Sequence, residues 1–159
     1  MLIATRSGKI NISKEKDTRL VAERLSKLIN LGDFILLTGN LGVGKTTFTK
    51  YIINSLQRIN RQAISEVPSP TFNITNEYQI KKILIKHYDL YRIKNEKELN
   101  NLGIQENLKK QITLVEWPEL LKKLKTKNSI SLIFKYNKNY TERYLTIIST
   151  NKKIMNEFK

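Results

Sequence analysis

The chain has 159 residues, no cysteine and a formal net charge of +15. The length suits one domain, the lack of cysteine excludes disulfides and thiolate metal sites, and no apolar run reaches the roughly 18 residues of a membrane span. Because the N-terminus also lacks the pattern of a secretion signal, we expect a cytoplasmic protein.

Most of the positive charge lies in the second half of the chain. Residues 1–80 carry 11 Lys and Arg against 6 Asp and Glu, whereas residues 81–159 carry 18 against 8. A basic surface can bind nucleic acid by neutralising phosphates. However, 22 of the 29 basic residues are Lys, and with abundant Asn and Ile this is typical of an AT-rich genome. The charge therefore either binds RNA or reflects codon bias.

Two strands and two helices are predicted before residue 60. The first strand is predicted over residues 2–12, with a turn at Ser7–Gly8, and the first helix over residues 14–30. A short strand over residues 34–37 and a second helix over residues 46–59 follow. The expected cap of the first helix is Ser13. The strand "FILL" is expected to be buried on both faces. The apolar face of the first helix is predicted to hold Val21, Leu25, Leu28 and Ile29. That of the second helix is predicted to hold Phe48, Ile52, Leu56 and Ile59.

The rest of the chain is predicted to be mainly strands, after a proline-containing loop over residues 66–72. The strands are expected through Phe72, Ile74, Tyr78 and Ile80, then over residues 83–92, 112–117, 129–136 and 143–149, the last two as a hairpin. Helices are expected over residues 95–110, broken at Gly103, and from Pro118 to about Lys125. This order predicts an α/β fold whose mixed sheet has a parallel core and antiparallel strands. We expect a single domain over residues 1–159, with a short tail from about Asn151.

The stretch "TGNLGVGKTTF" at residues 38–48 carries the clearest chemical signal. It matches G-x-x-x-x-G-K-[ST], with a predicted strand before it and a helix after it. Glycines let the backbone curl its N–H groups around a phosphate, and the helix N-terminus also favours an anion. We expect Lys45 to contact the β- and γ-phosphates of ATP and Thr46 to bind Mg²⁺. The predicted nucleotide-binding residues are Gly39, Asn40, Leu41, Gly42, Val43, Gly44, Lys45, Thr46 and Thr47.

Two acidic residues end apolar strands in a chain with few acids. Asp89 follows "ILIKHY" and Glu116 follows "ITLV". Because ligands of open α/β sheets bind at the carboxyl ends of the strands, either carboxylate could lie near Mg²⁺. His87, the only histidine, is expected to be structural rather than catalytic. Trp117, the only tryptophan, either packs in the core or lies beside the nucleotide.

Several classes of P-loop protein are excluded by missing motifs. A GTPase needs N-K-x-D, and the nearest match, "NKNY" at residues 137–140, has Tyr140 instead of Asp. A small-molecule kinase needs an arginine-rich lid, but only Arg92 and Arg143 follow residue 61. A minimal ATPase that needs a partner remains the favoured hypothesis. The alternatives are an RNA-binding module that uses nucleotide as a structural ligand and, less favoured, a small-molecule kinase.

Five motifs in order resemble the bacterial ATPase family of tRNA threonylcarbamoyladenosine biosynthesis, TsaE. They are "GDFILLTGNLGVGKTTFTKYI", "VPSPTFNITNEYQ", "IKHYDLYRI", "ELNNLGIQE" and "ITLVEWPE", and the resemblance covers about residues 10–135. The family often has Asp and Ala where this chain has Asn40 and Val43. The resemblance implies a P-loop NTPase-like three-layer fold.

The resemblance also implies a function and residue roles. The family takes part in adding threonylcarbamoyl to the adenosine beside the anticodon of tRNAs that read ANN codons. It hydrolyses ATP with Mg²⁺ in an assembly with TsaB and the transferase TsaD, which contact the tRNA. By position, Glu116, Asp89 and Thr71 would be catalytic, Thr46 and Glu116 would hold the metal ion, and Trp117 would lie near the nucleotide. The sequence does not decide between Asp89 and Glu116 as the metal contact.

Overall fold

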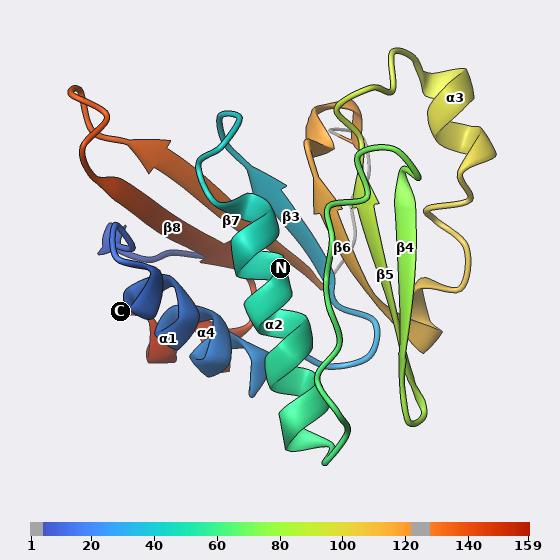
Figure 1. Cartoon of the computed structure of the whole chain (residues 1–159), viewed down its shortest axis with the longest axis horizontal. Helices are drawn as coiled ribbons and strands as arrows, with labels where there is room; N and C mark the ends of the chain where they lie inside the picture. Colours follow the sequence, from blue (N-terminus) through green and yellow to red (C-terminus); the bar gives the residue numbers. More distant parts are fainter. Residues whose placement is uncertain (1–4, 122–127) are drawn as a thin grey trace.

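A computed structural model describes residues 5–121 and 128–159 of the chain. Its strands form one sheet in the order β1-β8-β7-β3-β6-β5-β4, with β2 also paired to β8 (Figure 1). The strands are β1 (Thr5–Arg6), β2 (Ile10–Asn11), β3 (Phe34–Thr38), β4 (Thr75–Ile80), β5 (Ile83–Asp89), β6 (Gln111–Glu116), β7 (Ser129–Tyr136) and β8 (Arg143–Ser149). The helices are α1 (Glu15–Ser26), α2 (Lys45–Ile59), α3 (Glu96–Asn101) and α4 (Lys152–Glu157), with the 3-10 helices η1 (Leu108–Lys110) and η2 (Pro118–Leu121).

The centre of the sheet is parallel and its outer parts are antiparallel. Strand β3 lies between β6 and β7 and runs parallel to both, and β5 runs parallel to β6. Strand β4 pairs antiparallel with β5, and β8 pairs antiparallel with β7. The predicted mixed sheet with a parallel core is therefore confirmed. This arrangement brings the carboxyl ends of β3, β5 and β6 to one edge, which is where open α/β sheets bind ligands.

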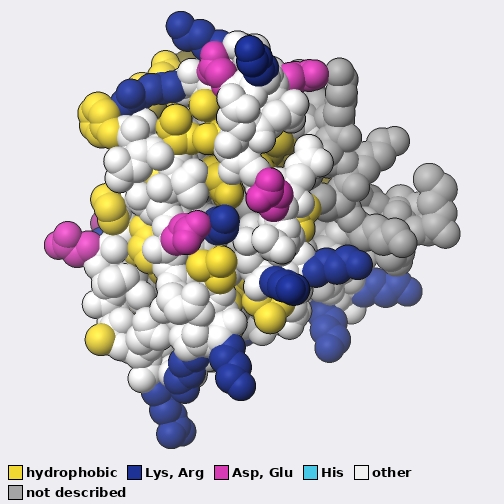
Figure 2. Space-filling model, turned by 90° about the vertical axis from the view of Figure 1, so that its right-hand side faces the viewer, with side chains coloured by type: hydrophobic (Ala, Val, Ile, Leu, Met, Phe, Trp, Pro, Cys, Tyr) yellow, Lys and Arg dark blue, Asp and Glu magenta, His cyan; other side chains and the backbone are white. Residues whose placement is uncertain are grey.

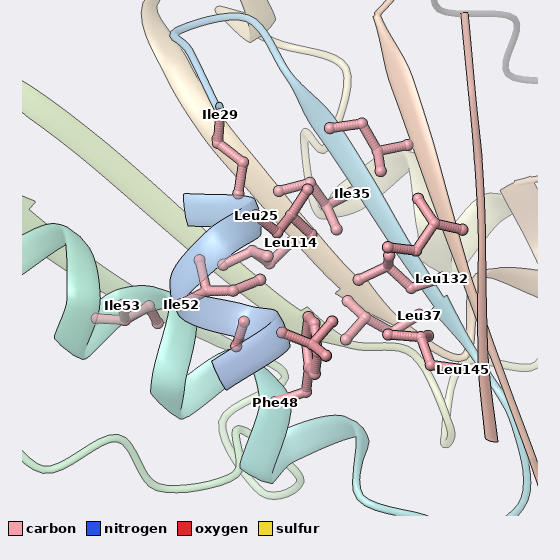
Figure 3. Packing of buried hydrophobic residues seen from close by; sticks show 14 of the residues in the cluster. Leu25, Ile29, Ile35, Leu37, Phe48, Ile52, Ile53, Leu114, Leu132 and Leu145 are labelled. Carbon is pink, nitrogen blue, oxygen red and sulfur yellow. The ribbon is translucent and has the colours of Figure 1, made fainter. Parts of the chain in front are cut away.

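Side chains of the central strands alternate between two apolar layers. Ile35, Leu37 and Leu114 point to the face covered by α1, α2 and α4, where they meet Leu25, Phe48 and Ile52 (Figure 3). Phe34, Tyr88 and Val115 point to the opposite face, which Leu99 of α3 and Leu121 of η2 cover. A strand buried on both faces reads as a nearly continuous apolar run, so the prediction for "FILL" is confirmed.

The surface along the edge strand β4 carries both apolar and charged side chains (Figure 2). Figure 2 shows apolar side chains scattered among Lys, Arg, Asp and Glu on this side of the molecule. Charged residues on an edge strand hinder pairing with another sheet, and β4 carries the exposed Glu77. Within the described residues, no helix is long and apolar enough to cross a membrane.

The N-terminal predictions need three corrections. The predicted helix over residues 14–30 ends at Ser26, and its N-cap is Lys14, which makes no side-chain capping bond. Ser13 is not the cap, because its hydroxyl accepts a hydrogen bond from the backbone N–H of Arg143 at 2.9 Å. The predicted strand over residues 2–12 is divided into β1 and β2, interrupted around the expected turn at Ser7–Gly8. Both short strands pair with β8.

The apolar stripe of the second helix is confirmed at three of its four positions. Phe48, Ile52 and Leu56 are buried, but Ile59 is 51% exposed. Ile59 is the last residue of α2 and is followed by a turn at residues 60–61.

Three predicted strands are too long. Phe72 and Ile74 lie outside β4, because residues 71–73 form turns and Ile74 has a φ of +65°. The strand predicted over residues 83–92 ends at Asp89, where Leu90 N–H turns to donate to the carbonyl of Glu116 at 3.0 Å. Trp117 likewise falls outside β6, with a φ of +57°.

The later helices differ more from the predictions. The break at Gly103 is confirmed, but the segment after it forms turns and the short helix η1 instead of a second half of the helix. The helix predicted from Pro118 is the 3-10 helix η2, and residues 122–125 lie outside the described residues. After Asn151, whose side chain caps α4, the helix buries Ile154 and Met155 in the larger core.

Candidate nucleotide-binding site

The glycine loop connects the end of β3 to the start of α2. A Cβ at Gly39 would lie 2.7 Å from the carbonyl oxygen of Phe134, so this position has room only for glycine. Gly44 is the N-cap of α2 with a φ of +111°, a conformation that side chains strongly disfavour. The sequence therefore forces a tight backbone curl whose last residue opens onto a helix N-terminus, a geometry that suits a phosphate.

Lys45 is almost enclosed by its own loop. Its side chain is 4% exposed, and Nζ donates hydrogen bonds to the carbonyls of Gly39 at 2.6 Å and Asn40 at 2.9 Å. The ammonium also lies 4.0 Å from the centre of the Trp117 ring. Burial lowers the pKa of Lys45, and the charges of Glu116, Asp89 and Glu119 oppose this shift. The site therefore holds a desolvated cation that an anionic ligand would stabilise.

Thr46 and Glu116 place two oxygen groups side by side at the mouth of the loop. The Thr46 hydroxyl donates to Glu116 Oε2 at 3.0 Å, and Glu116 is buried at the end of β6. A hydroxyl and a carboxylate are hard oxygen donors of the kind that Mg²⁺ prefers.

Asp89 lies next to Glu116 because the register of β5 and β6 pairs these two residues. Its carboxylate accepts from the Thr71 hydroxyl at 3.2 Å and from the backbone N–H of Tyr91 at 2.9 Å. Thr71 also shares a 2.6 Å hydrogen bond with the Ser69 hydroxyl. The proline-containing loop is thus tied to the end of β5 through Thr71.

His87 lies behind these groups and does not line the pocket. It is fully buried in β5, and Nε2 lies 2.9 Å from Glu116 Oε1. Each oxygen of the Glu116 carboxylate therefore has one partner, Thr46 on one side and His87 on the other.

A pocket of about 180 Å³ unites most of the predicted site. Lys45, Thr46 and Thr47 line it from α2, and Thr71, Asp89, Glu116 and Trp117 line it from the other strand ends and loops. Leu41, Gly42 and Gly44 contribute the loop. Gly39, Asn40 and Val43 are not part of the lining. The first two hold Lys45 through their carbonyls, and Val43 is buried in the core.

Two residues beside the site are absent from the sequence-based prediction. Ser69 lines the pocket and bonds Thr71, two positions away in the same loop. Tyr91 packs on Trp117 with ring centres 4.8 Å apart. Both residues lie in motifs that the sequence analysis quotes, Ser69 in "VPSPTFNITNEYQ" and Tyr91 in "IKHYDLYRI", but the contact of Tyr91 with Trp117 depends on the turns after β5 and β6.

The donor set fits a magnesium–nucleotide pair better than a metal ion held by protein alone. Among residues 5–121 and 128–159, no three His, Asp or Glu side chains gather as a metal cluster. Mg²⁺ is commonly bound by one or two protein oxygens, with waters and substrate phosphates completing its octahedron. Thr46 and Glu116 could supply two such oxygens, and Lys45 could supply a cation for the phosphates.

Comparisons with known proteins agree with each other. The family model described as "Threonylcarbamoyl adenosine biosynthesis protein TsaE" matches residues 12–145. A relative named tRNA threonylcarbamoyladenosine biosynthesis protein TsaE from Rickettsia conorii is 36% identical over 141 residues, covering 89% of this chain and 78% of the relative. The Bacillus subtilis protein of that name is 35% identical over 121 residues, covering 76% and 72%. The crystal structure of Bacillus subtilis YdiB has a similar fold, with a TM-score of 0.68, 24% identity and coverage of 98% and 90%.

Proposed function

The chain belongs to the TsaE family of threonylcarbamoyl adenosine biosynthesis, and on that basis we propose that it is an ATPase subunit of this pathway. It would bind ATP with Mg²⁺ and hydrolyse it while assembled with TsaB and TsaD. Those partners would carry the tRNA and transfer threonylcarbamoyl to the adenosine beside the anticodon of tRNAs that read ANN codons. Hydrolysis would reset the transferase between turnovers.

The observation that carries the ATPase proposal is the arrangement of Lys45, Thr46 and Glu116 around one pocket. Mg²⁺, when bound, neutralises charge on the β- and γ-phosphates. Thr46 and Glu116 would hold the ion, and the existing bond between them favours Glu116 over Asp89 as its carboxylate ligand. Lys45 would exchange its two carbonyl partners for phosphate oxygens, which compensate its buried charge better.

Asp89 and Thr71 are proposed to position the attacking water. Both line the pocket, and their hydrogen bond keeps the Thr71 hydroxyl close to the carboxylate. Phosphoryl transfer needs mainly positioning and charge stabilisation from the protein, so a hydroxyl and a carboxylate are sufficient to orient a water. Trp117 would shield Lys45 from solvent, since its ring already lies over the ammonium.

The first experiment tests the site. ATP turnover would be measured with Mg²⁺, with and without TsaB and TsaD, for the wild-type chain and Glu116→Gln. We expect turnover to be slow without the partners, to increase with them, and to fall roughly 100-fold in Glu116→Gln because an electrostatic contact is lost. Glu77→Gln is the matched control, because Glu77 is an exposed strand glutamate outside the pocket lining. Equal turnover in Glu116→Gln and wild type would show that the site is assigned wrongly.

The second experiment tests the pathway. The protein would be depleted in cells, and the nucleosides of total tRNA would be analysed for threonylcarbamoyladenosine. We expect this nucleoside to fall, and expression of wild-type chain to restore it where Glu116→Gln does not. An unchanged level after depletion would refute the pathway role while leaving the ATPase proposal intact.

A further inference from the structure

The buried contact between His87 and Glu116 has no role in the function proposed above. His87 is 0% exposed and lies in the middle of β5, paired in register with Leu114 of β6. Its Nε2 lies 2.9 Å from Glu116 Oε1, while Nδ1 is buried without a hydrogen-bond partner among the described residues. A fully enclosed imidazole that contacts one oxygen of a candidate ion ligand is positioned to control that ligand's geometry.

When the Glu116 carboxylate is ionised, the contacts favour one imidazole tautomer. An ionised carboxylate only accepts hydrogen bonds, so Nε2 must carry the proton that is donated to Glu116. Nδ1 then presents a lone pair instead of an N–H group, because one nitrogen of a neutral imidazole is an acceptor. A proton on Nδ1 would be a buried donor with no acceptor, which is costly. The contacts therefore select the tautomer with its proton on Nε2.

We propose that His87 is a positioning residue that sets the orientation of the Glu116 carboxylate for Mg²⁺ binding. This inference rests on the proposed function, because it assigns Glu116 to the ion. The imidazole engages Oε1 and so leaves Oε2 directed at Thr46, the second oxygen ligand. Second-layer partners that orient a metal ligand typically change metal affinity by about 10- to 100-fold when they are removed.

The test compares two amide variants that place an N–H group at different distances from the backbone. Glutamine in His87→Gln carries its amide nitrogen at about the reach of Nε2, whereas asparagine in His87→Asn carries it at about the reach of Nδ1. The readout is the fluorescence of Trp117, the only tryptophan, which lines the pocket and contacts Lys45. Mg²⁺ would be titrated at a fixed concentration of the non-hydrolysable ATP analogue AMP-PNP, and the analogue alone would be titrated in EDTA.

We expect the Mg²⁺ concentration at half-saturation to rise about 10- to 100-fold in His87→Asn and to stay within about threefold of wild type in His87→Gln. The Kd of AMP-PNP in EDTA is expected to stay within about threefold of wild type in both variants. This control separates a specific loss of Mg²⁺ affinity from damage to the fold, because a damaged fold would also weaken binding of the analogue. If His87→Asn and wild type need the same Mg²⁺ concentration, the positioning role is wrong. If wild type itself shows no response to AMP-PNP and Mg²⁺, the proposed function fails, and the inference fails with it.

A measurement on the wild-type chain keeps the inference testable if the variants do not fold. Long-range ¹H–¹⁵N correlation spectra of the ¹⁵N-labelled protein distinguish the two imidazole tautomers, and the single histidine makes the assignment direct. We expect Nε2 to be protonated and Nδ1 to be unprotonated. The opposite tautomer would overturn the inference, since His87 could not then donate to Glu116.

Discussion

Replacing Lys45 with methionine is expected to abolish tight nucleotide binding without destabilising the free protein. Methionine has a similar length, carries a sulfur in place of one methylene and lacks the ammonium. The ammonium donates to the carbonyls of Gly39 and Asn40, and bonds of this kind contribute about 1.5–3 kcal/mol each. Its contact with Trp117 contributes about 1 kcal/mol more.

An opposing cost nearly cancels these contributions. The side chain is 4% exposed, and burying an ammonium costs several kcal/mol, which is also why the pKa of Lys45 is lowered. We therefore expect the free energy of unfolding of nucleotide-free Lys45→Met to differ from wild type by less than about 2 kcal/mol. For a domain of this size the midpoint of thermal unfolding would shift by less than about 8 °C.

The loss in binding should be much larger. An ammonium about 4 Å from a phosphate charge contributes on the order of 4 kcal/mol at an effective dielectric constant near 20. This corresponds to about a 1000-fold increase in Kd. Calorimetric titration with ATP and Mg²⁺ would measure the Kd, and thermal unfolding without nucleotide would measure stability.

Lys50→Met provides the matched control, because Lys50 lies on the same helix, is exposed and does not line the nucleotide pocket. We expect neither its Kd nor its unfolding midpoint to change appreciably. Two results would refute the reasoning about Lys45. One is a Kd within threefold of wild type, and the other is an unfolding midpoint far below that of the wild-type chain without nucleotide.

Two further predictions concern stability and can be measured by thermal unfolding. Gly39→Ala should destabilise the fold by about 2–5 kcal/mol, because its Cβ would lie 2.7 Å from the Phe134 carbonyl oxygen and because its φ is +155°. Gly42→Ala should lower the free energy of unfolding by only about 1–2 kcal/mol, the cost of its positive φ, because its Cβ would meet no heavy atom within 4 Å. An equal loss of stability in Gly39→Ala and Gly42→Ala would contradict this explanation. Burial raises the pKa of Asp33 above its unfolded value, so this carboxyl group lowers stability as pH rises from about 3.9 through the folded pKa. Asp33→Asn should therefore unfold at a higher temperature than wild type at pH 7, with the difference shrinking toward pH 3, and a lower midpoint at pH 7 would contradict the sign.

The features that the sequence predicts correctly depend on local patterns. The run "FILL" indicated a strand buried on both faces, and β3 is such a strand. The run "ITLV" placed Glu116 at the end of a strand, and parallel pairing then brought it beside Asp89. The roles of the predicted site residues stay predictions until the binding and turnover measurements are made.

The features that the sequence does not predict depend on contacts between distant segments. Ser13 has the residue type of a helix cap, yet its hydroxyl binds the backbone of Arg143, which lies 130 positions away. Phe72 and Ile74 continue an alternating pattern, yet Ile74 has a left-handed conformation that ends the extended chain before β4. His87 gave no sign of its partner, because its bond to Glu116 requires two strands to lie side by side.

The pairing of Asp89 with Glu116 limits how the gene can change by insertion and deletion. Neighbouring residues of a strand face opposite ways, so adding or losing one codon within β6 would exchange the environments of Val115 and Glu116. The carboxylate would enter the apolar layer beside Phe34 and Tyr88, and a valine would stand opposite Thr46. Length variation between members of this lineage should therefore accumulate in the connections between elements, while β5 and β6 keep a constant number of residues.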